Sequence, residues 1–187
     1  MSAGGHTGLV LAGGRWAPAQ VRRHCEKYIA DDFHACVGDT TQLTGGGLDG
    51  LKQTIALWVI RSRFTDENWV SYRDPRIAAI VSGVPYAADF DLDSLRNPHT
   101  PLAIITAQKD VWLRPRFHSG PVLEVCTSCE HLFDFPNGSH GALLSPLPPN
   151  RSGTLATLIE DPPGFDPTQR DIAHQKVVAW FTRKLLP

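Results

Sequence analysis

The sequence predicts one domain of the α/β class, spanning residues 1–187, with a mostly parallel sheet flanked by helices. Two short, nearly uninterrupted apolar runs lie at Arg76–Val81 and Pro101–Thr106, and Cys129–Phe135 is a candidate for a third strand. A parallel strand is covered on both faces, so it is typically written as such a continuous run. Longer connections separate the runs, and an amphipathic helix is expected at Asp171–Leu186, which together indicate α/β organisation.

Length and composition are those of an ordinary globular domain. A chain of 187 residues can bury a substantial core, and 42% hydrophobic with 20% charged residues is a usual balance. A net charge of −1 with scattered Lys and Arg argues against a nucleic acid or an anionic membrane as partner. The apolar runs are too short to span a bilayer, and the first residues lack the pattern of a signal peptide, so the compartment stays open.

The first third of the chain predicts helices. The small, apolar segment Gly5–Gly14 suits a helix packed closely beneath a sheet, and Ala17–Ala30 has apolar residues at helical spacing. A polar, glycine-rich excursion covers Asp31–Gly50. Leu51–Phe64 is a second candidate helix, although its Thr54–Ile60 portion also fits a strand.

The remaining connections are mostly loops. Leu92–Leu95 fits a short helical turn, and Pro and Gly cluster at Thr44–Gly50, Pro146–Gly153 and Asp161–Pro167.

Four cysteines, Cys25, Cys36, Cys126 and Cys129, do not form a metal pattern. A zinc site would need two closely spaced pairs, and Cys25 and Cys36 are too far apart for one of them. Cys126 and Cys129 lack the strand-and-helix context of a thioredoxin-like site. We therefore expect no metal, and either buried thiols or a local Cys25–Cys36 disulfide.

The start of the chain resembles the second half of a nucleophile elbow. Ser2-Ala3-Gly4-Gly5 fits a G-x-S-x-G turn, whose small residues allow a helix and a strand to pass closely. The first glycine and the preceding strand of such a turn would fall before Met1. Ser2 would be the nucleophile and the Ala3 N–H one oxyanion donor. The alternative is a small serine near a flexible terminus.

An acid and a base follow Ser2 in the order that the α/β-hydrolase fold requires. Asp110 lies a few residues after the apolar run that ends at Thr106, and His140 follows a strand and a Pro-Asn-Gly turn. A serine hydroxyl needs an imidazole to take its proton and a carboxylate to orient that imidazole. The alternatives are a capping aspartate on a loop and an ordinary surface histidine, with His131 as the second choice of base.

The other histidines do not have this context. His6 is expected on the elbow helix and His24 on a charged helical face, while His34, His99, His118 and His174 follow no strand and turn.

In these features the chain resembles serine-dependent α/β-hydrolases of the predicted dienelactone hydrolase and platelet-activating-factor acetylhydrolase-like group. The matching segments, in order, are Ser2–Gly5, His24–Cys36, Asp74–Val81, Pro101–Asp110, the turn ending at His140, and Lys176–Leu186. The match spans most of this chain but about the C-terminal half of the family's domain. The expected fold is therefore an α/β-hydrolase fold truncated at the elbow, with its early strands absent.

The resemblance implies hydrolysis of a small-molecule carboxylic ester through an acyl-enzyme. Ser2 would be the nucleophile, His140 the base and then the acid, and Asp110 the orienting carboxylate, with no metal or organic cofactor. It also implies a Cys25–Cys36 disulfide, which would fit an exported enzyme. Gly-Ser-His140-Gly replaces the family's more apolar surroundings of that histidine.

Three interpretations stay open at this point. The chain is an esterase whose working form is longer, or it is a catalytically silent fragment or interaction module that self-associates through an exposed sheet edge. The third is an N-terminal-nucleophile hydrolase, in which trimming of Met1 leaves Ser2 to act with its own amine.

Overall fold

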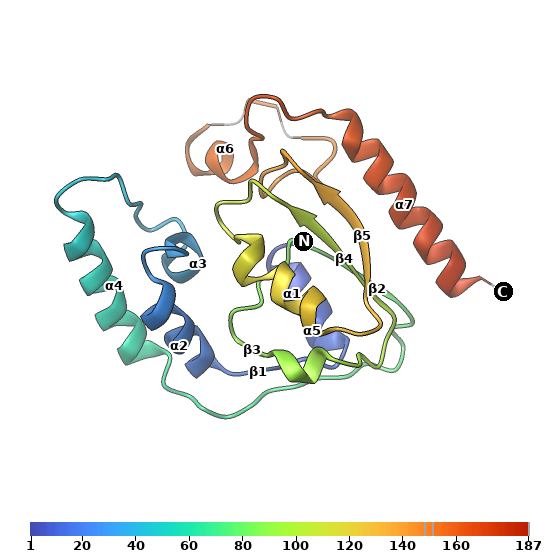
Figure 1. Cartoon of the computed structure of the whole chain (residues 1–187), viewed down its shortest axis with the longest axis horizontal. Helices are drawn as coiled ribbons and strands as arrows, with labels where there is room; N and C mark the ends of the chain where they lie inside the picture. Colours follow the sequence, from blue (N-terminus) through green and yellow to red (C-terminus); the bar gives the residue numbers. More distant parts are fainter. Residues whose placement is uncertain (148, 151, 187) are drawn as a thin grey trace.

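The computed structural model describes residues 1–147, 149–150 and 152–186, and it is organised around a parallel three-stranded sheet (Figure 1). The strands are β2 (Ile80–Gly83), β4 (Leu102–Ala107) and β5 (Glu130–Phe135), in the order β2-β4-β5. Both neighbouring pairs run parallel. The predicted combination of helices with a parallel sheet is confirmed.

Helices cover both faces of the sheet, and the central strand shows why its sequence is apolar throughout. All six residues of β4 are buried. Leu102 and Ile104 pack in one core with α1 (Ala3–Leu11) and α5 (Ser119–Val125). Ala103 and Ile105 face the other core, which α7 (Thr168–Leu185) closes with buried side chains that include Trp180. A strand that is buried on both sides has no polar alternation.

A small helical unit lies to one side of the sheet (Figure 1). It contains α2 (Pro18–Tyr28), α3 (Phe33–Val37) and α4 (Asp49–Arg63), and its core is formed by Val21, Cys25 and Ile60. Cys25 and Cys36 form a disulfide that joins α2 to α3. The alternative of a strand at Thr54–Ile60 is wrong, because α4 runs through it as a continuous helix.

Short elements link this unit to the sheet. β1 (Arg15–Trp16) and β3 (Phe90–Asp91) pair antiparallel, and η1 (Leu92–Leu95) is the predicted helical turn. The 3₁₀ turn η2 (Pro115–Phe117) precedes α5, and α6 (Gly153–Ile159) lies between the two predicted proline-rich loops. Two-residue strands have no periodicity to detect, so the sequence did not predict the β1–β3 pair.

Three local predictions require correction. The first strand begins at Ile80 rather than Arg76, because the Asp74 carboxylate accepts the Arg76 backbone N–H at 3.0 Å and holds a turn there. The elbow helix ends at Leu11 rather than Gly14, since Gly13 has a φ of 112° and Gly14 donates to the Leu9 carbonyl.

The third correction concerns the second cysteine pair. Cys126 and Cys129 form a disulfide rather than remaining thiols. Cys126 ends α5, and the chain turns there toward β5, which leaves the two Cα atoms 5.5 Å apart. None of the cysteines is free.

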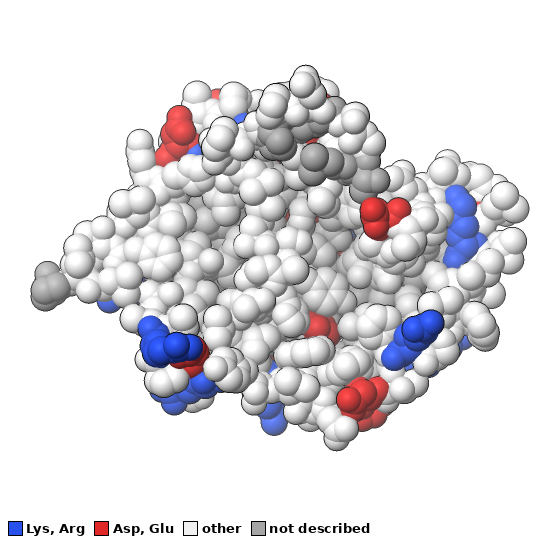
Figure 2. Space-filling model, turned by 180° about the vertical axis from the view of Figure 1, so that it is seen from behind, with Lys and Arg blue, Asp and Glu red and all other residues white. Residues whose placement is uncertain are grey.

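Two features of the described residues bear on membranes and on charge. Among the described residues, no helix has the length and apolarity needed to cross a membrane. On the face drawn in Figure 2, acidic and basic side chains are interspersed toward the rim, and no patch of one sign forms there.

Candidate active site

Ser2 has the backbone conformation of a sharp, strained turn. Its φ is 54° and its ψ is −123°, values that residues with a Cβ rarely adopt. The Ser2 N–H donates to the Gly83 carbonyl at 3.1 Å, and a parallel bridge joins Ser2 to Pro85. α1 begins at the next residue. Ser2 therefore lies where a segment running beside the end of β2 turns into a helix.

Glycines let α1 lie directly against β2. A Cβ on Gly5 would come within 2.9 Å of the Gly83 oxygen, and one on Gly8 within 3.1 Å of Ile80 Cγ2. This close packing is what the small residues after Ser2 predicted. Ala3 is the first residue of α1, so its N–H has no acceptor within the helix and is available to an anion.

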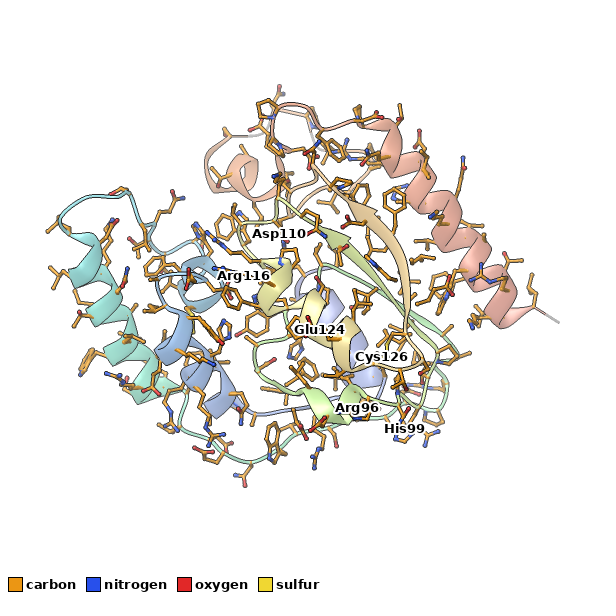
Figure 3. All side chains as sticks on the ribbon, in the orientation of Figure 1. Arg96, His99, Asp110, Arg116, Glu124 and Cys126 are labelled. Atoms are coloured by element: carbon orange, nitrogen blue, oxygen red, sulfur yellow. A yellow bond between two sulfur atoms is a disulfide. The ribbon has the colours of Figure 1, made fainter. Side chains whose placement is uncertain are left out.

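Asp110 and His140 form a buried pair at the carboxyl end of the sheet, where Figure 3 labels Asp110 after β4. His140 Nδ1 lies 2.7 Å from Asp110 Oδ2. The other carboxylate oxygen accepts the backbone N–H groups of Trp112 and Leu113, each at 2.9 Å. Since a carboxylate only accepts, His140 Nδ1 carries the proton and Nε2 is left as the basic nitrogen.

The loop that carries His140 is held rigidly. Ser139 donates to Asp161 through its backbone N–H at 2.8 Å and through its hydroxyl at 3.0 Å. Gly141 has no room for a side chain, because a Cβ there would lie 2.3 Å from the Ile159 carbonyl oxygen. These contacts fix the imidazole, whose residue is 3% exposed.

The segment Met1–Ser2 and the loop after His140 both approach the carboxyl end of β2. A Cβ on Gly83 would lie 2.9 Å from Leu143, which follows His140, and 3.9 Å from the Met1 Cα. Figure 1 shows the N-terminus beside the sheet in this region. Among the described residues, no hydrogen bond joins Ser2 to His140. The structure thus brings Asp110 and His140 into contact, and it places Ser2 beside the carboxyl end of β2, without a hydrogen bond to that pair among the described residues.

A cleft of about 1200 Å³ adjoins the pair on the side of Asp110 and Ser139. Trp112 forms part of its wall, and its indole N–H donates to the Thr157 carbonyl at 3.1 Å. Arg116, which Figure 3 labels, also lines the cleft and donates to Asp31 at 3.0 Å. The remaining wall is contributed mainly by prolines and charged side chains, among them Lys109, Arg114, Pro115, Glu160, Pro162 and Pro163.

Sequence reasoning missed a second buried cluster of titratable side chains. Asp32 Oδ2 lies 2.8 Å from His24 Nε2 and 3.0 Å from His118 Nε2. His24 was expected on a charged helical face; it does lie on helix α2, but its side chain is only 9% exposed and turns toward Asp32. His6 on α1 makes a similar contact with Asp89, at 2.9 Å.

The cluster perturbs the ionisation of Asp32 and of Tyr86, whose ring lies 5.1 Å from that of His118. Burial raises the pKa of Asp32, but hydrogen bonds and charge from His118 and His24 outweigh it and bring that pKa below its ordinary value. Burial, together with the charges of Asp89 and Asp32, raises the pKa of the Tyr86 hydroxyl far above its ordinary value. In the sequence, His24 directly precedes Cys25 and Asp32 lies between Cys25 and Cys36, which was the one local signal for this cluster.

Comparisons with known proteins add no neighbour: no family model, no curated protein and no solved structure matches this chain. Within the described part of the chain, no group of three or more His, Cys, Asp or Glu side chains could hold a metal ion.

Proposed function

We propose that this chain carries a serine hydrolase site of the α/β-hydrolase type that cleaves small carboxylic esters through an acyl-enzyme. The observation that carries the proposal is the combination of the strained Ser2 turn with the buried Asp110–His140 pair at the same end of the sheet. Either feature alone has ordinary structural explanations. Their joint placement matches the roles that a triad requires.

In the proposed reaction, Ser2 Oγ attacks the ester carbonyl while His140 Nε2 takes its proton. The resulting oxyanion accepts the Ala3 N–H, and His140 then returns the proton to the leaving alkoxide as the ester C–O bond breaks. Water repeats the sequence on the acyl-enzyme: His140 takes its proton, the carboxylic acid leaves, and Ser2 Oγ is protonated again. Asp110 remains ionised and stabilises the imidazolium in both halves.

Apo enzymes often show long catalytic hydrogen bonds that tighten when substrate binds, so the lack of a Ser2–His140 bond is compatible with the proposal. Asp110 and Ser139 line the neighbouring cleft but Ser2 and His140 do not, so we assign it to a part of the ester away from the reacting carbonyl, held by Trp112, prolines and polar groups.

An interaction module is a second candidate, and the position of β2 favours it. Within the described residues β2 pairs with β4 as its one partner strand, and its opposite edge is met by the Ser2 N–H, which donates to the Gly83 carbonyl beside the bridge from Ser2 to Pro85. An unpaired strand edge can template association with another chain. Size-exclusion chromatography with light scattering over a concentration series would detect it.

The experiment that separates the two is covalent labelling with a fluorophosphonate, read by intact mass. The wild-type chain is expected to gain one adduct, and Ser2→Ala none. Ser71→Ala, which removes an exposed serine, is the matched control and should label like the wild type. A folded wild-type sample that forms no adduct, or an adduct that persists in Ser2→Ala, would overturn the esterase proposal.

A further inference from the structure

We infer that Asp32 and His118 are positioning residues for Ser2: they fix the segment Val84–Asp89, which in turn fixes the elbow. The inference rests on the proposed function, since it assigns these residues a role in presenting that nucleophile. Neither residue lies in the proposed triad, and both are almost completely buried, with exposed fractions of 1% and 0%.

His118 is held from both sides of its ring. Its Nδ1 accepts the Ala87 backbone N–H at 3.1 Å, and its Nε2 lies 3.0 Å from Asp32 Oδ2. A nitrogen that accepts cannot carry the proton, so the proton is on Nε2 and is donated to Asp32. Asp32 therefore fixes the tautomer that Ala87 needs, just as a triad carboxylate fixes its histidine.

The burial of Asp32 indicates more than packing. Its Oδ2 serves both imidazoles, while Oδ1 is buried without a partner in the described part of the chain. A buried, unpaired carboxylate oxygen is unfavourable, and apolar side chains of similar volume are often as stable as a buried ionic cluster. What an apolar replacement could not supply is an acceptor aimed at the Ala87 N–H.

The segment Val84–Asp89 contacts both Ser2 and the helix that follows it. Pro85, two residues before Ala87, forms the parallel bridge with Ser2, and its Cα would lie 2.9 Å from a Cβ on Gly5 in α1. At the far end of the segment, Asp89 binds His6, one turn into the same helix. A displacement of this segment would therefore move Ser2 and the Ala3 N–H together.

The backbone of this segment is strained, so it needs contacts that hold it in place. Val84 has a φ of 37°, which is a strained conformation for a β-branched residue. A strained backbone conformation persists only where several surrounding contacts hold it. The hydrogen bond from Ala87 to His118 is one of the contacts that can hold it in place, along with the Val84 N–H to the Ile105 carbonyl at 2.9 Å.

Two substitutions of His118 separate its two contacts. In His118→Asn the side-chain oxygen can replace Nδ1 as acceptor for Ala87, whereas in His118→Gln the amide can replace Nε2 and reach Asp32. We expect the rate constant of fluorophosphonate labelling at Ser2 to fall about 100-fold in His118→Gln and less than 10-fold in His118→Asn, because misplacing a catalytic group by about 1 Å costs about 10² in rate. His99→Gln is the matched control, at an exposed histidine outside the proposed site.

Each rate is measured on samples shown to be folded by circular dichroism, with the unfolding midpoint recorded beside it. A merely structural role would lower the midpoint of His118→Gln and leave its labelling rate unchanged, which would overturn the inference. Equal labelling rates in His118→Gln and His118→Asn would also overturn it.

A second measurement keeps the inference separate from the proposed function. Hydrogen exchange at the Ser2 and His6 amides, which donate to Gly83 and Ser2, reports the position of the elbow without any catalysis. We expect exchange at both to rise at least tenfold in His118→Gln and not in His118→Asn. If the wild type does not label, the esterase proposal fails. Unchanged amide exchange in His118→Gln would independently refute the inference that His118 holds Ser2 in position.

Discussion

Gly5 lies directly against Pro85: a Cβ built on Gly5 would come within 2.9 Å of the Pro85 Cα. The contact joins the first turn of the elbow helix to the strained segment after β2, and both partners are backbone atoms that cannot swing aside. The same position would lie 2.9 Å from the Gly83 oxygen, which accepts the Ser2 N–H. The geometry of Ser2 therefore depends on the absence of a side chain at position 5.

Gly5→Ala is expected to destabilise the chain by about 1–3 kcal/mol, the usual cost of overpacking a core. Gly4→Ala is the matched control, because a Cβ at Gly4 meets nothing within 4 Å. Alanine favours a helix over glycine by about 1 kcal/mol, so this control should be neutral or stabilising. Urea unfolding measures both, and a Gly5→Ala chain as stable as the wild type would contradict the packing described here.

Asp110→Asn tests the orientation of His140. The two backbone N–H groups of Trp112 and Leu113 require an acceptor, so the amide oxygen is expected to face them and the amide NH₂ to face His140 Nδ1. His140 would then carry its proton on Nε2 and could not take the serine proton. We expect labelling at Ser2 to slow by about 10⁴-fold, the size of this effect in a serine protease.

The control for this substitution is Asp93→Asn, at an aspartate whose side chain is 75% exposed. It should label at the wild-type rate. If Asp110→Asn labels at the wild-type rate, the Asp110 carboxylate does not orient His140.

The sheet and the Asp110–His140 pair could be predicted because both depend on local sequence. A run such as Pro101–Thr106 specifies a doubly covered strand by itself, and a polar residue soon after a parallel strand lies at the functional edge of the sheet. The Asp110–His140 pair then requires only that the two strands before these residues be neighbours in the sheet. The start of β2 was misplaced because the Asp74 turn depends on a side-chain hydrogen bond rather than on hydropathy.

The Asp32–His118 pair could not be predicted in the same way. Its members are 86 residues apart, and each lies in a segment with no distinctive pattern. Burying an aspartate is unfavourable unless a donor is supplied, and the donors here come from α2 and from the turn before α5. Only the assembled fold brings these donors together, so sequence alone gives His118 no reason to differ from any other histidine.

Tyr86 is expected to keep its proton well above the pH at which tyrosine ordinarily ionises, near pH 10. Burial and the charges of Asp89 and Asp32 raise the pKa of its hydroxyl, so the folded chain binds a proton that the unfolded chain loses. Stability that depends on Tyr86 is therefore present below about pH 10 and is lost as the pH rises further.

Ultraviolet titration of the wild type and of Tyr86→Phe measures this directly. The two chains should release the same amount of phenolate up to pH 11, about one unit above the ordinary pKa of tyrosine. A smaller phenolate signal in Tyr86→Phe over that range would mean that the hydroxyl is accessible and ionises normally.

The two disulfides are expected to differ in what they stabilise. Cys25 and Cys36 are separated by 11 residues in the sequence and Cys126 and Cys129 by 3, so the first closes the longer loop of the unfolded chain. In the loop-entropy model, replacing the first pair by alanine lowers the free energy of unfolding by about 3 kcal/mol, and replacing the second by about 2 kcal/mol. Denaturant unfolding of Cys25→Ala/Cys36→Ala and of Cys126→Ala/Cys129→Ala measures which bridge contributes more.

The first bridge also joins α2, which carries His24, to α3, which begins directly after Asp32. The second bridge lies at the far end of α5. Labelling at Ser2 should therefore slow in the first variant only, and equal slowing in both would show that the bridge stabilises the fold without holding Asp32 in place.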